Sequence, residues 1–135
     1  MASILKVDEM QGVTSAGDIT ITGEGTATMQ LQQGLCKQWS KFDHTAVSVY
    51  DSFNTSSMSD IATGKYRSDF TNNMNNDDYC IVGTCIEVGV AYGNTTGPHT
   101  SDALGTNAYG MRTIDTNDNL RDMDHVSTSV NGDLA

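Results

Sequence analysis

YCIVGTCIEVGVAY, residues 79–92, is the most apolar stretch of the 135-residue chain. Its β-branched residues favour a strand, because branched side chains pack well on a pleated surface. We therefore predict that this stretch forms a central strand, or a pair of strands that pivots at Gly83 or Gly89.

Shorter strands are predicted on both sides of this stretch. Two of them form a hairpin of residues 57–61 and 65–70, because Gly64 between them can take the left-handed turn position. Apolar and β-favouring residues predict further strands at 18–22, 46–50, 109–114 and 125–130. Polar residues predict loops at 72–78, 93–106 and 115–124, the last as the turn between the two final strands.

One segment, residues 28–39, fits two patterns. Leu31, Leu35 and Trp39 have the spacing of a helix face, weakened by Gly34. The second half of the segment also alternates as a strand does, and we favour a strand there. With about seven short strands and no strand–helix alternation, the chain is expected to be all-β, an antiparallel β-sandwich or a barrel-like domain.

The chain has few apolar residues for a domain of this length. Hydrophobic residues make up 37% of the chain, which is below the ordinary range once its 13 glycines are set aside. Disorder is not favoured, because the charged fraction is 18%, proline occurs once, and Thr, Ser and Asn suit strands and turns. A small core of this kind is often completed by oligomerisation, so we expect an oligomer.

The chain is expected to divide into an N-terminal arm and an outer domain. Residues 1–25 are too short and too polar to hold a core and should form a short extended attachment arm, followed by a β-rich domain at 26–135. Contacts with partners are predicted for apolar residues of the arm and for the tyrosines that flank the 93–106 loop, namely Ile4, Leu5, Val7, Tyr92 and Tyr109. Most other aromatic side chains are expected in the core.

The net charge of −10 limits the possible partners. It excludes ordinary nucleic-acid binding, which requires clustered Lys and Arg, and it disfavours docking on anionic lipid. The sequence has neither a secretory signal nor an apolar run long enough to span a membrane, so we expect synthesis in a cytoplasm and release by a route such as lysis.

Three cysteines and three histidines offer no recognisable reactive pattern. Cys80 and Cys85 are five residues apart in one predicted strand, so their side chains should point to opposite faces, and with Cys36 they are expected to be buried free thiols. The histidines lack zinc-motif spacing and a supporting catalytic sequence, and each is expected to be a surface or packing residue, at His44, His99 and His125.

The acidic segment 115–124 has oxygen ligands at its first, third and fifth places, as at the start of a calcium-binding loop. It then has Leu120 where glycine is needed and Val126 where a bidentate Glu belongs, which excludes an EF-hand and leaves an irregular cation site or a solvated turn. Carboxylates that could serve polysaccharide hydrolysis are present at Asp102, Asp115 and Asp124, but abundance alone specifies no pair. We therefore expect no enzyme, and predict no catalytic, cofactor-binding or metal-binding residues.

Several stretches resemble short β-rich proteins of marine tailed phages, described as tail-fibre-like or virion structural proteins. They are Ile4 to Glu9 with Gln11; Leu31 to Leu35 with Lys37 and Trp39; Asp51 to Asn54; Thr63 to Tyr66 and Phe70 to Asn72 with Asn75, Asn76 and Tyr79; and Met111-Arg112 through Asp124 to Asp133. The chain departs from the family pattern at Lys41 to His44, where a Gly/Asn-rich turn is expected, and in having no long preceding stalk.

The resemblance implies an exterior appendage of the virion, made in the infected host cytoplasm. It implies a homotrimer whose N-terminal arm binds other virion proteins and whose outer domain contacts a host-surface glycan or protein. The missing stalk leaves a capsid-bound knob or decoration protein as an alternative to a tail fibre. An appendage enzyme that degrades polysaccharide is the alternative of another class.

Overall fold

The computed structural model describes residues 5–13, 19–22, 25–89, 94–98 and 104–135, with the backbone alone for 94–98. The chain divides into two compact units, Met1–Leu35 and Cys36–Ala135, which we call unit 1 and unit 2. The sequence predicts a division after residue 25, whereas the structure divides after residue 35. The reason is that the strand at residues 28–30 pairs with the strand at residues 20–22 and so belongs to unit 1.

Unit 1 is a β-hairpin followed by a single helical turn. Strand β1 (Thr20–Thr22) pairs antiparallel with β2 (Thr28–Gln30), and α1 (Leu31–Gly34) follows directly. The Leu31 amide donates to the Ile19 carbonyl at 2.8 Å and fixes the start of α1 against the hairpin. The ambiguous segment thus contains both predicted structures, a helical turn and then a strand. No described residue of unit 1 is buried.

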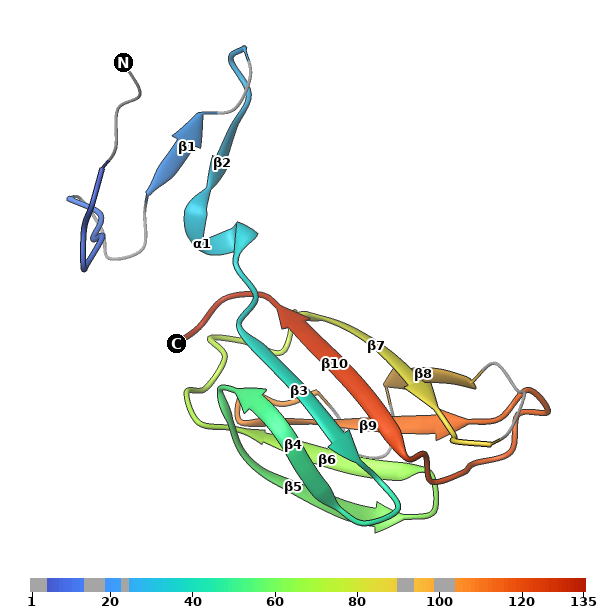
Figure 1. Cartoon of the computed structure of the whole chain (residues 1–135). Coiled ribbons are helices and arrows are strands. Elements are labelled where there is room, and N and C mark those ends of the chain that lie inside the picture. Colours follow the sequence, from blue (N-terminus) through green and yellow to red (C-terminus); the bar gives the residue numbers. More distant parts are fainter. Residues whose placement is uncertain (1–4, 14–18, 23–24, 90–93, 99–103) are drawn as a thin grey trace. The chain divides into compact units, whose positions relative to one another are not determined.

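Unit 2 is one eight-stranded antiparallel sheet in the order β4-β3-β10-β7-β8-β9-β6-β5 (Figure 1). Its strands are β3 (Gln38–Asp43), β4 (Ser48–Phe53), β5 (Thr55–Ala62), β6 (Lys65–Phe70), β7 (Cys80–Ile86), β8 (Asn94–Pro98), β9 (Ala108–Ile114) and β10 (His125–Asn131). The predicted all-β class is confirmed. The sheet ends at β4 and β5 and does not close into a barrel.

The two end strands of the sheet are joined at a sharp corner. Asn54 lies between β4 and β5 with a positive φ of 56°, a conformation that asparagine tolerates. Its side-chain amide donates to the carbonyls of Lys37 and Asn72 at 3.0 and 3.1 Å, and its Oδ1 accepts from the Asn72 amide at 2.6 Å. This corner brings the far ends of the sheet together, so the sheet folds over on itself.

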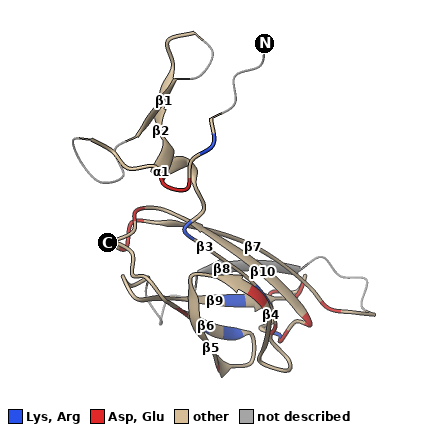
Figure 2. Ribbon diagram, turned by 60° about the vertical axis from the view of Figure 1, so that its left-hand side comes forward, with Lys and Arg blue, Asp and Glu red and all other residues tan. Residues whose placement is uncertain are grey.

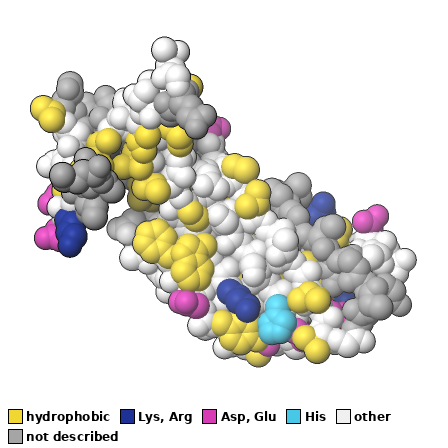
Figure 3. Space-filling view, turned by 45° about the horizontal axis from the view of Figure 1, so that its top comes forward, with side chains coloured by type: hydrophobic (Ala, Val, Ile, Leu, Met, Phe, Trp, Pro, Cys, Tyr) yellow, Lys and Arg dark blue, Asp and Glu magenta, His cyan; other side chains and the backbone are white. Residues whose placement is uncertain are grey.

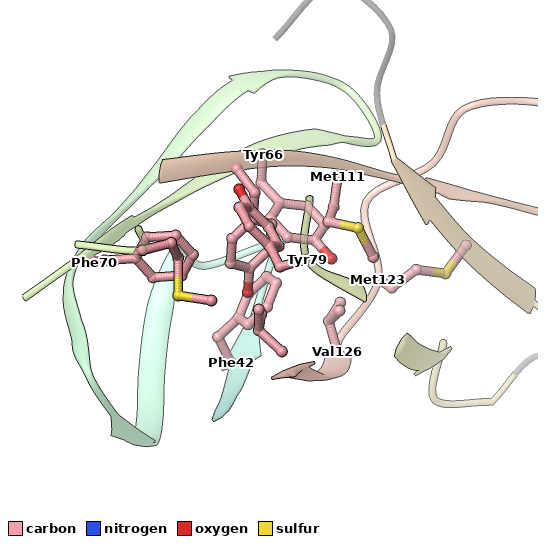
Figure 4. Packing of buried hydrophobic residues seen from close by; sticks show 10 residues of the cluster. Phe42, Tyr66, Phe70, Tyr79, Met111, Met123 and Val126 are labelled. Carbon is pink, nitrogen blue, oxygen red and sulfur yellow. The ribbon is translucent and has the colours of Figure 1, made fainter. Parts of the chain in front are cut away.

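The core lies between the facing halves of the folded sheet (Figure 4). Phe42 of β3 packs edge-on against Tyr66 of β6, with ring centroids 4.6 Å apart. On the same side, Val126 of β10 and Met111 of β9 are almost fully buried. Burying each such side chain contributes on the order of 2 kcal/mol to folding.

A buried hydrogen-bond network supplements this small apolar core. The Tyr109 hydroxyl lies 2.9 Å from Thr128 Oγ1 and donates to Gln38 Oε1 at 3.2 Å. Ser40 Oγ in turn lies 2.8 Å from Thr128 Oγ1. Because these groups satisfy one another, Ser, Thr and Gln can occupy inward positions without the penalty of an unpaired buried group.

Two predicted connections are different in the structure. Residues 94–98, placed in the predicted 93–106 loop, form β8, which pairs with both β7 and β9. The segment 115–124 is not a hairpin turn, because β9 pairs with β6 and β8 whereas β10 pairs with β3 and β7. It crosses from one half of the folded sheet to the other.

Candidate functional site

The outward surface of strands β4, β3, β10 and β7, which we call the outer face, is the candidate site. Alternation along each strand directs one set of side chains into the core and the next set outward. On β10, Val126, Thr128 and Val130 are buried while Ser127 is exposed. On β7, the exposed side chains are Cys80, Val82, Thr84 and Ile86.

Two exposed aromatic rings lie side by side on the outer face. Trp39 of β3 is the register partner of Phe53 of β4, and both side chains point outward, 38% and 51% exposed. Figure 3 shows hydrophobic side chains on the face of unit 2 that it draws, with a basic residue and a histidine beside them. Neighbouring exposed apolar groups of this kind commonly mark a contact surface.

A third aromatic ring on the outer face, that of Tyr50, lies close to side chains of β3 and β10. Its ring centroid lies 5.9 Å from Lys41 Nζ and 5.6 Å from the His125 ring. The Tyr50 hydroxyl donates to Asp43 Oδ2 at 3.2 Å. Desolvation by its neighbours, followed by the charge of Asp43, raises the pKa of Tyr50, which keeps the phenol protonated as a donor.

Beside the aromatic pair lies a shallow groove of about 270 Å³ between β7 and β10. Four outward side chains surround it in two register pairs, Ser129 with Val82 and Ser127 with Thr84. The backbone at Gly83 and Thr128 lines it between them. Strands β7 and β10 contain no Lys, Arg, Asp or Glu, so the lining is uncharged (Figure 2).

A buried histidine forms a second polar cluster, at the end of the β3–β4 hairpin. His44 Nε2 lies 3.6 Å from Asp60 Oδ1, and Nδ1 lies 3.6 Å from Asp122 Oδ1. Thr113 Oγ1, 3.5 Å from Nδ1, donates instead to the Arg121 carbonyl at 2.6 Å. Because the Thr113 hydroxyl already donates to the Arg121 carbonyl, we do not interpret it as a nucleophile with His44 as its base. We interpret the cluster as contacts that hold together the segments of His44, Asp60 and Asp122.

The predicted partner contacts have different outcomes. Leu5 and Val7 are 81% and 51% exposed in unit 1 and are available for contact. Ile4 and Tyr92 lie outside the described residues. Tyr109 requires a correction, because its side chain is completely buried and hydrogen-bonded in the core, where it cannot reach a partner.

Two carboxylates of segment 115–124, those of Asp115 and Asp124, accept hydrogen bonds from backbone amides. Asp115 Oδ1 accepts from the amides of Asn117 and Asn119 at 2.8 and 3.0 Å, and these bonds lower the pKa of Asp115. Asp124 Oδ2 accepts from the Val88 amide at 2.7 Å. Within the described ranges, no three His, Cys, Asp or Glu side chains are grouped to hold a metal ion. Asp102 and His99 lie outside those ranges.

All three cysteines are free, as predicted, but their burial differs from the prediction. Cys80 and Cys85 point to opposite faces of β7, as expected, and Cys36 and Cys80 are exposed. Burial raises the pKa of the half-buried Cys85 thiol to about 11.

The residues of the outer face were not predicted as a site. Core packing was expected for most aromatic side chains, and Phe42, Tyr66, Phe70 and Tyr79 are indeed buried. The signal available in the sequence is the alternation in 125–130, which places Ser127 and Ser129 on the face of the strand opposite to that of the valines. It could not show that Ser129 lies beside Trp39 and Ser127 beside Lys41, because that depends on strand order.

Comparison of the chain with protein-family models, with curated proteins and with solved structures gives no match. In the part of the chain that the structure describes, no helix has the length and apolar character needed to cross a membrane.

Proposed function

We propose that the chain is an exterior structural protein of a tailed-phage particle, an oligomeric appendage that contacts the host surface and does not act as an enzyme. One observation carries the proposal: a folded β-sheet unit is joined to an N-terminal unit in which no described residue is buried. The resemblance of the sequence to tail-fibre-like virion proteins supports the phage context.

Most of the large apolar side chains that the structure describes in unit 1 are exposed. Segments of its size rarely fold without a disulfide, a metal or a partner, and a two-stranded hairpin is marginal alone. Its described surface also contains an apolar groove of about 160 Å³. The groove is lined by Met10, Ile19, Leu31, Gln32 and Leu35. A partner that covers this groove would give unit 1 the core it lacks.

Copies of the same chain are a suitable partner for this surface. A chain of net charge −10 repels its own copies, so self-association requires a surface without acidic groups. Strands β1 and β2 and helix α1 contain no charged residue. We therefore infer that unit 1 joins copies of the chain and leaves unit 2 for contact with the host.

The carboxylates support a non-catalytic role. Glycoside hydrolysis requires two carboxyl groups held across a cleft, one of them able to donate a proton. Asp115 and Asp124 instead accept hydrogen bonds from backbone amides: Asp115 stabilises its own turn, and Asp124 binds the Val88 amide that follows β7. The outer-face groove is lined by Val, Gly, Ser and Thr residues and has no acidic side chain.

The proposal is tested with the full chain and two matched variants. We expect an oligomer by light scattering, converted to monomer by Leu35→Asp, since Leu35 is 53% exposed and lines the groove of unit 1. Ile61→Asp, on an equally exposed residue of β5, should leave the oligomer intact. Mass spectrometry of purified particles should detect the protein. A monomeric wild-type protein that is absent from particles would refute the proposal.

A further inference from the structure

We propose that the outer-face groove between β7 and β10 binds a neutral saccharide, with Trp39 as the stacking wall. The inference rests on the proposed function, since it assigns a chemical class to the host-surface ligand. The groove, the aromatic pair beside it and the distribution of charge support it.

The groove presents hydroxyl groups at the spacing of adjacent strands. Ser127 and Thr84 are register partners, and Ser129 lies opposite Val82. A serine or threonine hydroxyl donates one hydrogen bond and accepts others, and its orientation adapts to the partner. Such groups match the hydroxyls of a sugar, which also both donate and accept. Ser129 Oγ is further placed by Cys36 Sγ at 3.2 Å.

The aromatic pair supplies the apolar part of the site. Trp39 is the register partner of Ser129 on β3, and Phe53 lies directly beyond it on β4. A hexose has hydroxyls at its edge and C–H groups on its faces, so a ring can pack on the face while hydroxyls bind the edge. Aromatic side chains provide such area at a small loss of conformational freedom. The groove and its wall therefore match both surfaces of one sugar ring.

The charges favour a neutral ligand. Strands β7 and β10 contain no charged residue. Lys41, the basic residue of β3 on this face, has the acidic Asp51 as its register partner. The chain as a whole has a net charge of −10, so an anionic polysaccharide would be repelled over the distance of a Debye length, roughly 10 Å at 0.1 M salt.

The arrangement on the outer face is unlike that of a protein–protein contact. Protein interfaces place apolar anchors at the centre and polar groups at the rim. Here the small hydroxyl side chains Ser127 and Ser129 lie in the middle strand, and the large apolar groups lie to either side, at Trp39 on β3 and Val82 on β7. A shallow hollow edged by small hydroxyl side chains fits a narrow ligand with its own hydroxyls better than it fits a second protein surface.

The experiment uses the full chain and its single tryptophan as the probe. Hexasaccharides of glucose, mannose, galactose and N-acetylglucosamine are titrated while Trp39 fluorescence and calorimetric heat are recorded, with polyuronate as the acidic comparison. At least one neutral hexasaccharide should bind and perturb Trp39, and polyuronate should not. Ser127→Tyr fills the groove from an exposed position, and Trp39→Ala removes the wall. Each should weaken binding by about tenfold or more, whereas Ile61→Ala should not change it.

Three results would overturn the inference. These are no binding to any neutral hexasaccharide, binding to polyuronate alone, and a loss of oligomer in Trp39→Ala, which would make the outer face a contact between copies. Detection in particles with no saccharide binding would refute the inference and leave the proposed function standing. If Trp39→Ala does not fold, calorimetry with Ser127→Tyr decides the question.

Discussion

A single glycine fixes the contact between the β5–β6 turn and the segment that follows β9. Gly64 has a φ of +65°, and a Cβ built on it would lie 2.5 Å from the Arg121 amide nitrogen and 2.7 Å from the Thr113 carbonyl oxygen. These neighbours are backbone atoms and cannot move as a flexible side chain would. We expect Gly64→Ala to lower the free energy of unfolding of unit 2 by about 2–5 kcal/mol, measured by urea denaturation.

The control for this prediction is Gly89, which separates conformational strain from steric conflict. Gly89 has a φ of +81°, but no heavy atom lies within 4 Å of the corresponding Cβ position. Gly89→Ala should therefore cost only the left-handed strain, about 1 kcal/mol. Equal losses in the two variants would show that the close approach at Gly64 contributes nothing.

The two glycines also show what could be predicted at the scale of residues. The turn role of Gly64 follows from its place between two strand patterns, and the structure confirms it. Its contact with Arg121 could not be predicted, because residues 57 positions apart meet only through the order of strands in the sheet. The same limit explains why the sequence predicts a partner contact for the buried Tyr109 and none for the exposed Trp39 and Phe53.

Strand β7 offers a direct test of its two faces. Cys80 points outward and is exposed, whereas Cys85 points toward the core and burial raises its pKa to about 11. The thiolate is the species that reacts, so a raised pKa leaves less of it at moderate pH. At about pH 8 we expect iodoacetamide to label Cys80 and to label Cys85 about a hundredfold more slowly. Peptide mapping by mass spectrometry measures both rates.

Raising the pH and unfolding the chain serve as controls for this labelling. Labelling of Cys85 should accelerate as the pH approaches 11, because its thiolate then forms. In urea both thiols should react alike, since the difference arises from burial. Similar rates in the folded protein at about pH 8 would contradict the assignment of Cys85 to the inward face.

Elements with their own local pattern were predictable, and elements defined by their neighbours were not. The hairpin of β5 and β6 is formed as predicted, because its register depends on one short turn. Strand β8 is polar at Asn94, Thr95 and Thr96 and has the composition of a loop. It is a strand because β7 and β9 offer hydrogen-bonding edges on both sides. The sequence likewise predicts a turn for the crossing segment 115–124, since the adjacency of β9 and β10 along the chain suggests that they pair.

At the scale of the whole molecule, the net charge of −10 should oppose folding. Compact states bring the carboxylates closer together, and the resulting repulsion is screened by salt. The exposed pair Asp77 and Asp78, in the loop before β7, adds to it. We expect Asp77→Asn with Asp78→Asn, which changes the net charge to −8, to raise the free energy of unfolding by on the order of 0.5 kcal/mol in low salt.

Salt separates this long-range effect from any local one. The gain should be present in urea denaturation at about 0.02 M NaCl and largely lost at about 0.3 M, where the screening length is shorter than most distances between surface charges. The wild-type protein should gain stability over the same range of salt. The Asn variant retains the shape and hydrogen-bonding atoms of the loop, so a gain that is equal at both salt concentrations would point to the loop itself. In that case the acidity of the chain would matter for contact between molecules, where it disfavours anionic ligands, more than for the stability of the fold.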